Sequence, residues 1–463
     1  MAHVILGGGI TGLGAGYFLA RAGKQVVVVE KRESGGGMAG SFVHRGFVCD
    51  VGPHKLYSVL PGVMALYKDL LGEECLTVEK KNSLRLCGSY FSFPVRPLQF
   101  AVRFPKITAA RCGLSYAMTF LKPSSVPVTY EDYFLAGFGR AAYRLLFEGF
   151  CWKVWGNPRE ISAELARRRI PVPSIKEFIK NMVVSKQKPE VSADVFYYPR
   201  GGVGRVCDRL AEHVLKAGAV EYGSQPSRLV VRDGRVVEIE VRRAIGKSVI
   251  HDPETVTSTL YLQDLLSLFD PPPPENVLQA AERLRYRSLL LVYVFVNRPR
   301  VLDDHWIFFP EREFVFNRVS EQKNFSAHVA PADKTFLVAE ISGDLNDFLW
   351  NMPEKQLADV AITDLVKAGL IASTDVDGTH IVRIDRMYPV YDLEYRKNLR
   401  IVLDWLHSIE NFYTIGRQGL FAYTNTDHSL DMGQKLAVQI LENKSRAEWE
   451  KTIDYFDSYR IVD

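Results

Sequence analysis

Three glycines and one acidic residue near the start of the chain have types and a spacing that suit the binding of a dinucleotide. Gly7, Gly9 and Gly12 form a GxGxxG pattern, and Glu30 follows the last of them by 18 residues. The first glycine allows a tight turn, the second lets the backbone approach a pyrophosphate, and the third lets a helix pack closely on a strand. A carboxylate at position 30 can accept hydrogen bonds from ribose hydroxyls but would repel a 2′-phosphate. The pattern therefore predicts FAD or NAD as the ligand and argues against NADP.

The residues around these glycines predict the elements that must hold them. Apolar residues 3–6 and 25–29 predict two strands, and residues 13–22 predict the helix between them. The N–H groups at the start of that helix would face the phosphates. A second glycine-rich segment, 35–40, leads into residues 47–54, and we expect this loop to pass close to a flat ligand. The strands, the helix and the acid together favour a dinucleotide site over an ordinary glycine turn.

Composition indicates a globular enzyme with more than one domain. The chain has 463 residues, of which 47% are hydrophobic and 24% charged, and its net charge of +4 is too small to indicate nucleic-acid binding. The six cysteines are scattered without CxxC spacing, which favours neither a zinc site nor a disulfide framework and suggests a reducing, cytoplasmic environment. The longest apolar run, 289–296, is too short to span a bilayer, and we expect no signal peptide before the first strand.

The order of helical and strand patterns predicts an α/β fold in which a discontinuous Rossmann-like nucleotide-binding domain is interrupted by a helical lobe and an antiparallel β-sheet lobe. We expect the functional cleft where the three parts meet. The segments are 1–81, 195–270 and 400–463 for the nucleotide-binding domain, which is the FAD-binding domain if the ligand is FAD, 98–194 for the helical substrate lobe, and 82–97 with 271–399 for the antiparallel sheet substrate domain.

Local patterns inside these parts make sharper predictions. Asp233 and Gly234 lie between two apolar runs and predict a β-hairpin. The alternation in EFVFNRV, residues 313–319, predicts a strand, and residues 354–368 predict a helix within the sheet domain. Near the end of the chain, the pattern predicts a helix that begins near Asp431 or Met432.

Four segments carry a likeness to a known family. They are VGPHKLYS (51–58), CWKVWGNP (151–158), DHWIFFPEREFVFNRVSEQKNFS (304–326) and GRQGLFAYTNTDHSLDMG (416–433). They resemble the histidine loop, the K-x-W segment, the paired strands and the closing motif of the UDP-galactopyranose mutases, a family within the glutathione-reductase-like and amine-oxidase-like flavoproteins. Two other segments, YYPRGGVGRVCDRLAEHV and STLYLQDLL, are similar instead to amine oxidases and protoporphyrinogen oxidases.

The resemblance implies a FAD-dependent isomerase that interconverts the pyranose and furanose forms of a nucleotide sugar, such as UDP-galactopyranose and UDP-galactofuranose, without net redox change. In the family, N5 of reduced FAD attacks the anomeric carbon, and the flavin–sugar adduct opens as an iminium. Such chemistry requires neither a metal nor a Ser/His/Asp triad. It also implies a role in cell-surface polysaccharide biosynthesis, with NAD(P)H as a candidate reductant and a homodimer as a candidate assembly.

The same resemblance assigns roles to individual residues. Several of them are arginines and tyrosines, whose guanidinium and hydroxyl groups can donate hydrogen bonds to the oxygens of a pyrophosphate. The implied catalytic residues are His54, Arg169, Arg417 and Tyr423. The implied substrate-binding residues are Trp155, Arg169, Tyr286, Arg298, Arg318, Tyr388, Arg417 and Tyr423. The cofactor-binding candidates are Gly7, Gly9, Gly12, Glu30, Lys31, Gly37, Met38, Gly52, His54, Asp427, Ser429 and Met432.

Plainer structural roles stay open for several of these residues. The arginine run 167–169 also suits a solvated helix face, Trp155 and the tyrosines also suit core packing, and His54 also suits an ordinary loop. Asp427 and Ser429 can cap the predicted helix, whose N-terminus can also face the flavin pyrimidine oxygens.

Two other functions stay open as well. One is a FAD-dependent oxidoreductase of the amine-oxidase or protoporphyrinogen-oxidase type, which would take a hydride from an amine, a porphyrinogen or a polyene. The other is a flavin-binding protein without catalysis. The nature of the substrate would distinguish among these hypotheses.

Overall fold

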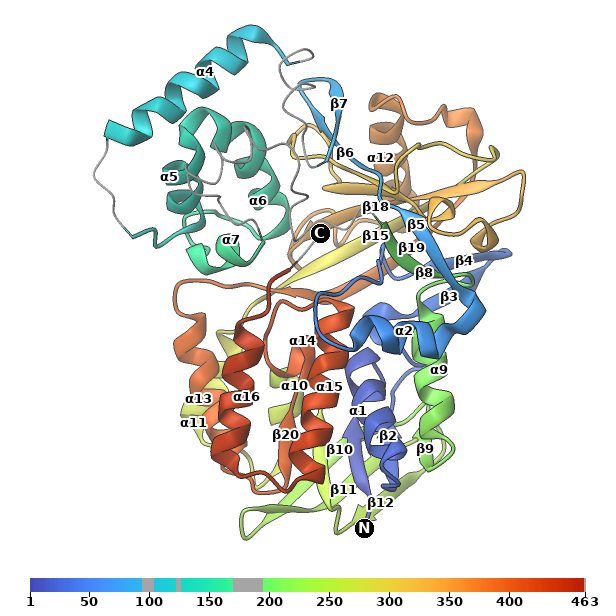
Figure 1. Ribbon diagram of the computed structural model, residues 1–463, viewed down its shortest axis with the longest axis vertical. Coiled ribbons are helices and arrows are strands. Elements are labelled where there is room, and N and C mark those ends of the chain that lie inside the picture. The colour runs from blue at the N-terminus through green and yellow to red at the C-terminus, as the bar shows by residue number, and fades with distance from the viewer. Residues whose placement is uncertain (94–103, 122–125, 170–194, 462–463) are drawn as a thin grey trace. The chain divides into compact units, whose positions relative to one another are not determined.

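The computed structural model describes residues 1–93, 104–121, 126–169 and 195–461, which fall into two compact units (Figure 1). The first unit comprises Met1–Thr77, Tyr197–Arg285 and Glu394–Ile461. The described residues of the second unit lie within Val78–Phe196 and Tyr286–Leu393. The chain passes between the units within strands β5 (Cys75–Glu79) and β8 (Val195–Pro199), and again between Arg285 and Tyr286 and between Leu393 and Glu394. The division of the second unit into a helical lobe and a separate sheet domain stays a prediction.

A five-stranded parallel sheet forms the centre of the first unit. Its strand order is β20-β13-β1-β2-β9, and every neighbouring pair is parallel. The strands are β1 (His3–Leu6), β2 (Val26–Val29), β9 (Gly218–Glu221), β13 (Thr255–Ser258) and β20 (Phe412–Thr414). Helix α1 (Ile10–Arg21) packs against α9 (Gly204–Val214) and α15 (Thr426–Leu441). The predicted Rossmann-like α/β fold is confirmed.

The glycine turn after β1 has the predicted form, except that its helix begins earlier. Helix α1 starts at Ile10 and not at residue 13, because Gly9 is the N-cap and its carbonyl accepts a hydrogen bond from the Leu13 N–H at 2.9 Å. Gly7 has a φ of 105°, which side chains rarely adopt. A glycine is therefore required at the first turn position for a conformational reason.

The rest of the first unit surrounds this sheet. Asp233 and Gly234, with φ values of 47° and 74°, form the predicted hairpin turn of a second sheet, whose order is β12-β11-β10-β14. The strands of that sheet and of a separate pair are β10 (Gln225–Arg232), β11 (Arg235–Arg242), β12 (Lys247–His251), β14 (Phe269–Asp270), β3 (Ser41–His44) and β4 (Phe47–Asp50). The other helices are α2 (Val63–Leu71), α10 (Leu262–Leu266), α11 (Glu275–Glu282), α13 (Tyr395–His407), α14 (Gly416–Gly419) and α16 (Arg446–Asp457).

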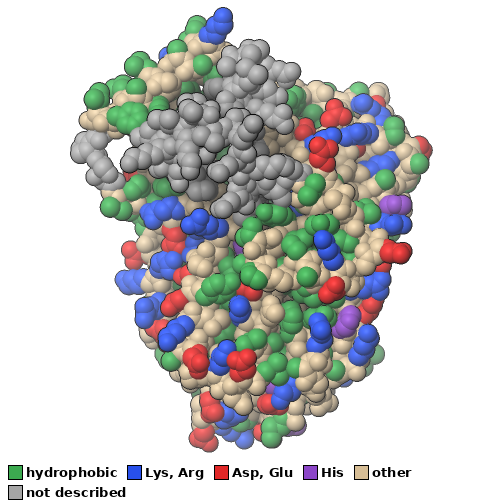
Figure 2. All heavy atoms as spheres, in the orientation of Figure 1, with side chains coloured by type: hydrophobic (Ala, Val, Ile, Leu, Met, Phe, Trp, Pro, Cys, Tyr) green, Lys and Arg blue, Asp and Glu red, His purple; other side chains and the backbone are tan. Residues whose placement is uncertain are grey.

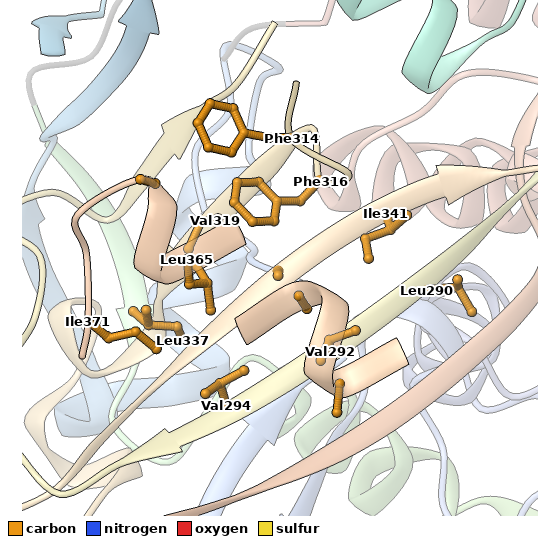
Figure 3. Close-up of a cluster of buried hydrophobic side chains, with 14 of the residues drawn as sticks. Leu290, Val292, Val294, Phe314, Phe316, Val319, Leu337, Ile341, Leu365 and Ile371 are labelled. Atoms are coloured by element: carbon orange, nitrogen blue, oxygen red, sulfur yellow. The ribbon is translucent and has the colours of Figure 1, made fainter. Parts of the chain in front are cut away.

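A seven-stranded sheet organises the second unit, in the order β19-β15-β18-β17-β16-β6-β7. Its strands are β6 (Asn82–Leu86), β7 (Ser89–Ser92), β15 (Tyr286–Val296), β16 (Trp306–Phe308), β17 (Arg318–Glu321), β18 (Thr335–Gly343) and β19 (Val376–Pro389). Helix α12 (Glu354–Lys367) nearly matches the predicted 354–368 and covers one face. Figure 3 shows Leu365 of this helix near Val319 and Leu337, and all three side chains are fully buried in one core. Removing this apolar surface from water is the main stabilising contribution of the sheet.

Short helices make up the described part of the predicted helical lobe. They are α4 (Lys106–Ala117), α5 (Tyr130–Tyr143), α6 (Gly149–Val154) and α7 (Ala163–Arg169), with a 3₁₀ turn at Met118–Leu121 and a π-helical turn at Arg144–Glu148. Residues 170–194 of the predicted lobe lie outside the described residues. Within the described ranges, no helix is both long and apolar enough to cross a membrane.

The predicted strand at residues 313–319 was wrong over its first five residues. Only Arg318 and Val319 belong to a strand, whereas the preceding residues form turns in which Phe314 and Phe316 are buried. Side chains bind two backbone groups of this segment: the Lys153 ammonium donates to the Phe316 carbonyl at 2.9 Å, and the Asp364 carboxylate accepts the Val315 N–H at 2.7 Å. Because these side chains come from distant parts of the chain, local alternation did not reveal the turn.

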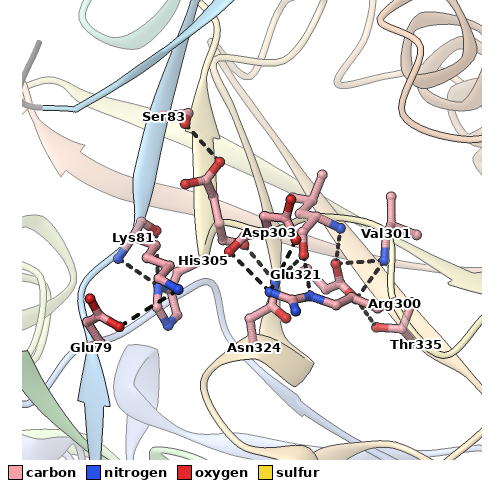
Figure 4. Close-up of polar contacts among 12 residues, drawn as sticks. Glu79, Lys81, Ser83, Arg300, Val301, Asp303, His305, Glu321, Asn324 and Thr335 are labelled. Atoms are coloured by element: carbon pink, nitrogen blue, oxygen red, sulfur yellow. Dashed lines mark hydrogen bonds and ion pairs between the residues drawn. The ribbon is translucent and has the colours of Figure 1, made fainter.

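A buried carboxylate, Glu321, organises the loop that leads into β16 (Figure 4). Its oxygens accept hydrogen bonds from the Val301 N–H at 3.0 Å and from the Thr335 hydroxyl at 2.6 Å. The Leu302 N–H also donates to it, at 2.5 Å. Burial raises the pKa of Glu321, and these donors oppose that rise. A buried acid thus satisfies the backbone donors of this loop.

Candidate cofactor site

The turn between β1 and α1 leaves space where a phosphate group would approach the backbone. A Cβ atom added at Gly9 would have the Gly36 carbonyl oxygen, 4.0 Å away, as its nearest neighbour within the first unit. A Cβ at Gly12 would instead overlap the Gly7 carbonyl oxygen. Gly12 is therefore needed for packing within the protein, whereas the absence of a side chain at Gly9 keeps open the position of a ligand.

Glu30 lies directly after β2 with its carboxylate turned back to the turn. The side chain is buried, and its two oxygens accept hydrogen bonds from the Gly8 N–H at 2.7 Å and the Arg32 N–H at 2.8 Å. A carboxylate has about four lone-pair positions, so both oxygens can still accept ribose hydroxyls. Glu30 is thus held in place by the turn that it would help to complete.

The second glycine-rich loop packs on the first. The Gly36 N–H donates to the Gly8 carbonyl at 2.8 Å, and Gly36 forms a parallel bridge with Gly9. Gly36 has a φ of 103° and Gly37 a φ of 58°, so both need the freedom of glycine. Residues predicted separately along the sequence therefore form one backbone surface.

Two other predicted cofactor residues, Lys31 and Met38, lie in the segment that starts after Glu30 and includes the second glycine-rich loop. Lys31 is exposed, directly after Glu30. Met38 is half-buried, and its sulfur accepts a hydrogen bond from the Gln418 side chain at 3.7 Å. Gln418 belongs to α14, so this contact joins the glycine loop to the closing motif.

The predicted start of the last motif helix near Asp431 or Met432 was wrong, because α15 begins at Thr426. Asn425 is the N-cap, and its backbone N–H donates to Nδ1 of His428 at 3.1 Å in a capping box. Asp427 and Ser429 consequently lie in the first turn and not before the helix, and both are buried together with Met432. A histidine replaces the usual glutamate of this box, which explains why the sequence pattern did not mark the helix start.

The start of α15 contacts the histidine loop, residues 51–58. The Ser58 hydroxyl donates to Oδ2 of Asp427 at 2.8 Å, and the Tyr67 hydroxyl donates to the Thr426 hydroxyl at 3.2 Å. The other carboxylate oxygen, Oδ1 of Asp427, is buried and makes no hydrogen bond to any described residue. A buried acceptor of this kind fits a ligand with hydrogen-bond donors, such as the ribityl chain or ring of a flavin.

His54 lies in the same loop, where its Nδ1 atom is 2.9 Å from the Gly52 carbonyl oxygen. This contact requires a proton on Nδ1, because a carbonyl oxygen only accepts. Gly52 has a φ of 80°, which bends the chain before His54. The loop geometry thus sets the orientation of the imidazole ring.

Sequence reasoning missed Tyr459, which closes over the start of α15. Its ring stacks on His428 with centroids 4.4 Å apart and an angle of 11°, and its hydroxyl donates to Asp431 at 2.5 Å. The pKa of His428 is lowered, mainly because burial disfavours the charged imidazolium. Only a tertiary contact brings Tyr459 here, and no spacing in the sequence signals it.

The first and last motifs of the chain meet through glycines. A Cβ on Gly433 would lie 2.6 Å from the backbone nitrogen of Ala15, and one on Gly14 would lie 3.0 Å from Leu430. Gly416, with a φ of 86°, would likewise place a Cβ 3.0 Å from the Thr11 hydroxyl. The final glycine of the closing motif is therefore a packing residue that lets α15 approach α1.

Arg417 and Tyr423 are brought together beside this helix pair. An Arg417 guanidinium N–H donates to the Thr424 carbonyl, and its central carbon lies 5.8 Å from the centroid of the Tyr423 ring. Tyr423 is buried. The carbonyl and the ring fix the direction of the guanidinium.

Trp155 and Arg169 are neighbours in the second unit. The Arg169 guanidinium lies 5.8 Å from the Trp155 ring, and Trp155 packs on Tyr130 and Phe150. Only 2% of Trp155 is exposed, so its ring is largely a packing element in this structure.

The other four substrate candidates lie along the large sheet of the second unit. Tyr286 pairs with Pro389, and Tyr388 pairs with Arg287, so the two tyrosines share one end of β15. Arg298 lies beyond the opposite end of this strand of 11 residues, at a separation of about 35 Å. It is exposed and forms an ion pair with Asp375 at 3.3 Å. The structure therefore does not bring Arg298 beside the tyrosines.

Arg318 forms an ion pair with Glu340, which belongs to the same unit. It makes two hydrogen bonds to buried Glu340, at 2.5 and 2.8 Å, and stacks at 5.2 Å on Trp306. A paired, stacked guanidinium of this kind holds β17 to β18 and is largely neutralised by Glu340.

Comparison with solved structures shows the fold. A crystal structure of reduced UDP-galactopyranose mutase is 20% identical, with a TM-score of 0.85 over 100% of this chain and 98% of that one. A putrescine oxidase bound to putrescine is 16% identical, with a TM-score of 0.63 over 95% and 99% of the two chains. An oxidoreductase from Methanosarcina mazei is 15% identical, with a TM-score of 0.62 over 96% and 100%. No curated protein sequence matches the chain.

Two family models match the sequence itself. The model of the NAD(P)-binding Rossmann-like domain matches residues 5–70, which include the glycine turn, Glu30 and the histidine loop. The model of flavin containing amine oxidoreductases matches residues 114–384, more than half of the chain. With the glycine turn, the buried acid and the flavin-compatible acceptor at α15, these matches support FAD as the cofactor. The chain belongs to the flavin containing amine oxidoreductase family.

Proposed function

We propose that this protein is a FAD-dependent mutase that interconverts the pyranose and furanose forms of a nucleotide sugar, UDP-galactose or a related sugar. The observation that carries the proposal is the arrangement of the closing motif, in which Arg417 and Tyr423 adjoin each other next to the helix that meets the cofactor turn. The likeness to a reduced UDP-galactopyranose mutase over the full length of both chains supports it.

The residues of the first unit fit the proposed cofactor. Gly9 leaves room for the pyrophosphate, Glu30 accepts the ribose hydroxyls, and the start of α15 with Asp427 receives the flavin half. Reduced FAD, when bound, supplies the nucleophile for the anomeric carbon. The protein then has to hold the nucleotide diphosphate while the sugar ring opens and closes.

Arg417 is the proposed partner of that diphosphate. A guanidinium presents five N–H donors in a plane, so the Thr424 carbonyl can take one while others bind phosphate oxygens. The Tyr423 ring limits the rotation of the guanidinium. Arg417 thereby holds a leaving group that stays bound until the sugar returns to it.

Replacing Arg417 by lysine is expected to weaken UDP binding about tenfold while the flavin content stays unchanged. Lysine keeps the charge but loses the planar fork that fixes the bidentate geometry. Calorimetric titration with UDP and the flavin absorbance of the purified variant measure the two effects. Arg298→Lys, in an exposed ion pair of the second unit, is the matched control and should bind UDP normally. Loss of flavin from the Arg417 variant would reassign this residue to the cofactor.

The activity is expected only when the flavin is reduced. Under anaerobic conditions with dithionite, UDP-galactofuranose should be converted to UDP-galactopyranose, and the oxidised protein should be inactive. Separation of the two sugar nucleotides by chromatography measures the conversion. Addition of NADH or NADPH without dithionite tests whether a nicotinamide can be the reductant. Failure of the reduced protein to convert any of several UDP, GDP or TDP sugars would contradict the proposal.

A second candidate function is a flavin oxidoreductase that acts on an amine or a porphyrinogen. The family match and the similarity to a putrescine oxidase favour it. Oxygen or dye reduction on addition of putrescine or a porphyrinogen, together with no sugar-nucleotide conversion, would select this function over the mutase.

A further inference from the structure

Helix α4 and the 3₁₀ turn Met118–Leu121 present large apolar side chains to solvent. Ile107 is 76% exposed, Leu114 67%, Met118 55% and Leu121 85%. Their spacing of seven, four and three residues places them on one side of a helix. We call these four residues the apolar stripe. Single exposed apolar residues are ordinary, but a contiguous row of them indicates an interaction surface.

The opposite side of α4 holds the helix to the protein with small residues. The Ser115 hydroxyl accepts a hydrogen bond from the Ala141 N–H at 3.0 Å, and a Cβ at Gly139 would lie 2.5 Å from the Ser115 carbonyl oxygen. No residue of α4 is fully buried. The usual amphipathic arrangement is therefore reversed, with small groups inward and large apolar groups outward, and folding of the chain does not account for the stripe.

The charged residues of α4 itself are all basic. Residues 80–130 contain eight lysines and arginines and no aspartate or glutamate, although the whole chain is nearly balanced. Lys106 and Arg111 belong to α4 itself and are exposed. Figure 2 shows hydrophobic side chains along the surface of α4, with a basic side chain at its upper end. A helix that exposes apolar side chains and carries only basic charges complements an anionic apolar partner.

We propose that the apolar stripe, with Lys106 and Arg111, docks the protein on the surface of an anionic lipid bilayer. The apolar side chains would enter the boundary between headgroups and acyl chains, and the two bases would bind lipid phosphates. The charge disfavours a second copy of this chain as the partner, because a two-fold interface would place the same basic surface against itself. This inference is independent of the proposed function.

Vesicle sedimentation tests the proposal with the full-length flavoprotein. We expect the protein to sediment with vesicles of equimolar phosphatidylcholine and phosphatidylglycerol, and to bind vesicles of phosphatidylcholine alone about tenfold more weakly. Added salt should weaken the binding to the anionic vesicles. Absence of sedimentation with the anionic vesicles at low salt would overturn the proposal.

Three variants separate the stripe from unspecific adsorption. The double variant Leu114→Glu, Leu121→Glu should lose vesicle binding by at least about tenfold. Lys106→Gln with Arg111→Gln should retain weak binding but lose the dependence on salt and anionic lipid. Ile245→Glu, in the first unit and 95% exposed, is the control and should bind like the parent protein. Because all these side chains are exposed, flavin content and thermal unfolding should stay unchanged.

Two results would overturn the assignment to lipid. The first is equal vesicle binding by the parent protein and by the stripe variant Leu114→Glu, Leu121→Glu. The other is a concentration-dependent dimer that light scattering detects and the stripe variant abolishes, without any vesicle binding, which would identify a second copy as the occupant.

Discussion

Gly9→Ala is expected to leave the apoprotein folded and equally stable while it lowers FAD affinity by about 2 kcal/mol, or about thirtyfold. Gly9 has φ and ψ of −70° and 173°, which alanine adopts without strain, and the added Cβ would have no neighbour closer than 4.0 Å. The open space is the one that a pyrophosphate would enter. Thermal unfolding of the apoprotein and fluorescence titration with FAD measure the two quantities separately.

Gly12→Ala provides the contrast from the same turn. Its Cβ would overlap the Gly7 carbonyl oxygen and lie 3.2 Å from Ile5, so this variant should lower the unfolding temperature of the apoprotein itself. If Gly9→Ala bound FAD as tightly as the parent protein, the phosphate would not lie on this turn. If Gly9→Ala instead destabilised the apoprotein, the effect on FAD would be indirect.

Lys153→Met is expected to destabilise the protein by about 3–5 kcal/mol. The Lys153 ammonium donates to the carbonyl oxygens of Phe309 at 2.7 Å, Glu311 at 2.6 Å and Phe316 at 2.9 Å, and methionine of similar volume would leave all three without that donor. The unfolding temperature should fall by roughly 10 °C. Lys355→Met makes the same substitution on the surface, in an exposed ion pair with Asp359, and should change the unfolding temperature little.

The same lysine should give stability a measurable pH dependence. Burial lowers the pKa of Lys153 from 10.5 to about 7, outweighing the raising effects of Glu311, Asp364 and Glu313. Between these two pH values the unfolded chain binds a proton that the folded chain does not, so this group makes stability rise with pH across that window. Denaturant unfolding of the parent protein and of Lys153→Met at several pH values measures the difference. An identical slope in both proteins would show that Lys153 stays charged in the folded state.

Lys153 also changes the interpretation of the K-x-W segment. The resemblance associated this segment with a substrate cleft, whereas the structure gives Lys153 three backbone carbonyl partners and leaves Trp155 only 2% exposed. Whether Trp155 contacts substrate stays a prediction. The segment has a structural function in either case, because it supports the turns around Phe314 and Phe316.

The best sequence predictions concern local structure. The limits of β1, the hairpin at Asp233 and Gly234, and the helix near 354–368 depend on residues within a few positions of each other. The start of α15 and the turns at 313–317 depend on side chains that replace the usual partners, His428 in one case and Lys153 with Asp364 in the other. A side chain that takes the place of a usual hydrogen-bond partner of the backbone leaves no periodic pattern in the sequence, so sequence analysis cannot detect it.

By itself, the sequence predicted a dinucleotide site at Gly7 to Gly12, with Glu30 as the acceptor of ribose hydroxyls, because each of these predicted roles follows from residue type and short spacing. Only the tertiary structure decided that Gly433 packs on Ala15, that Ser58 binds Asp427 and that Tyr459 closes over His428. These pairs are separated by hundreds of residues or lie on different elements. Their contacts arise from helix packing around one parallel sheet, and that packing is a property of the folded chain as a whole.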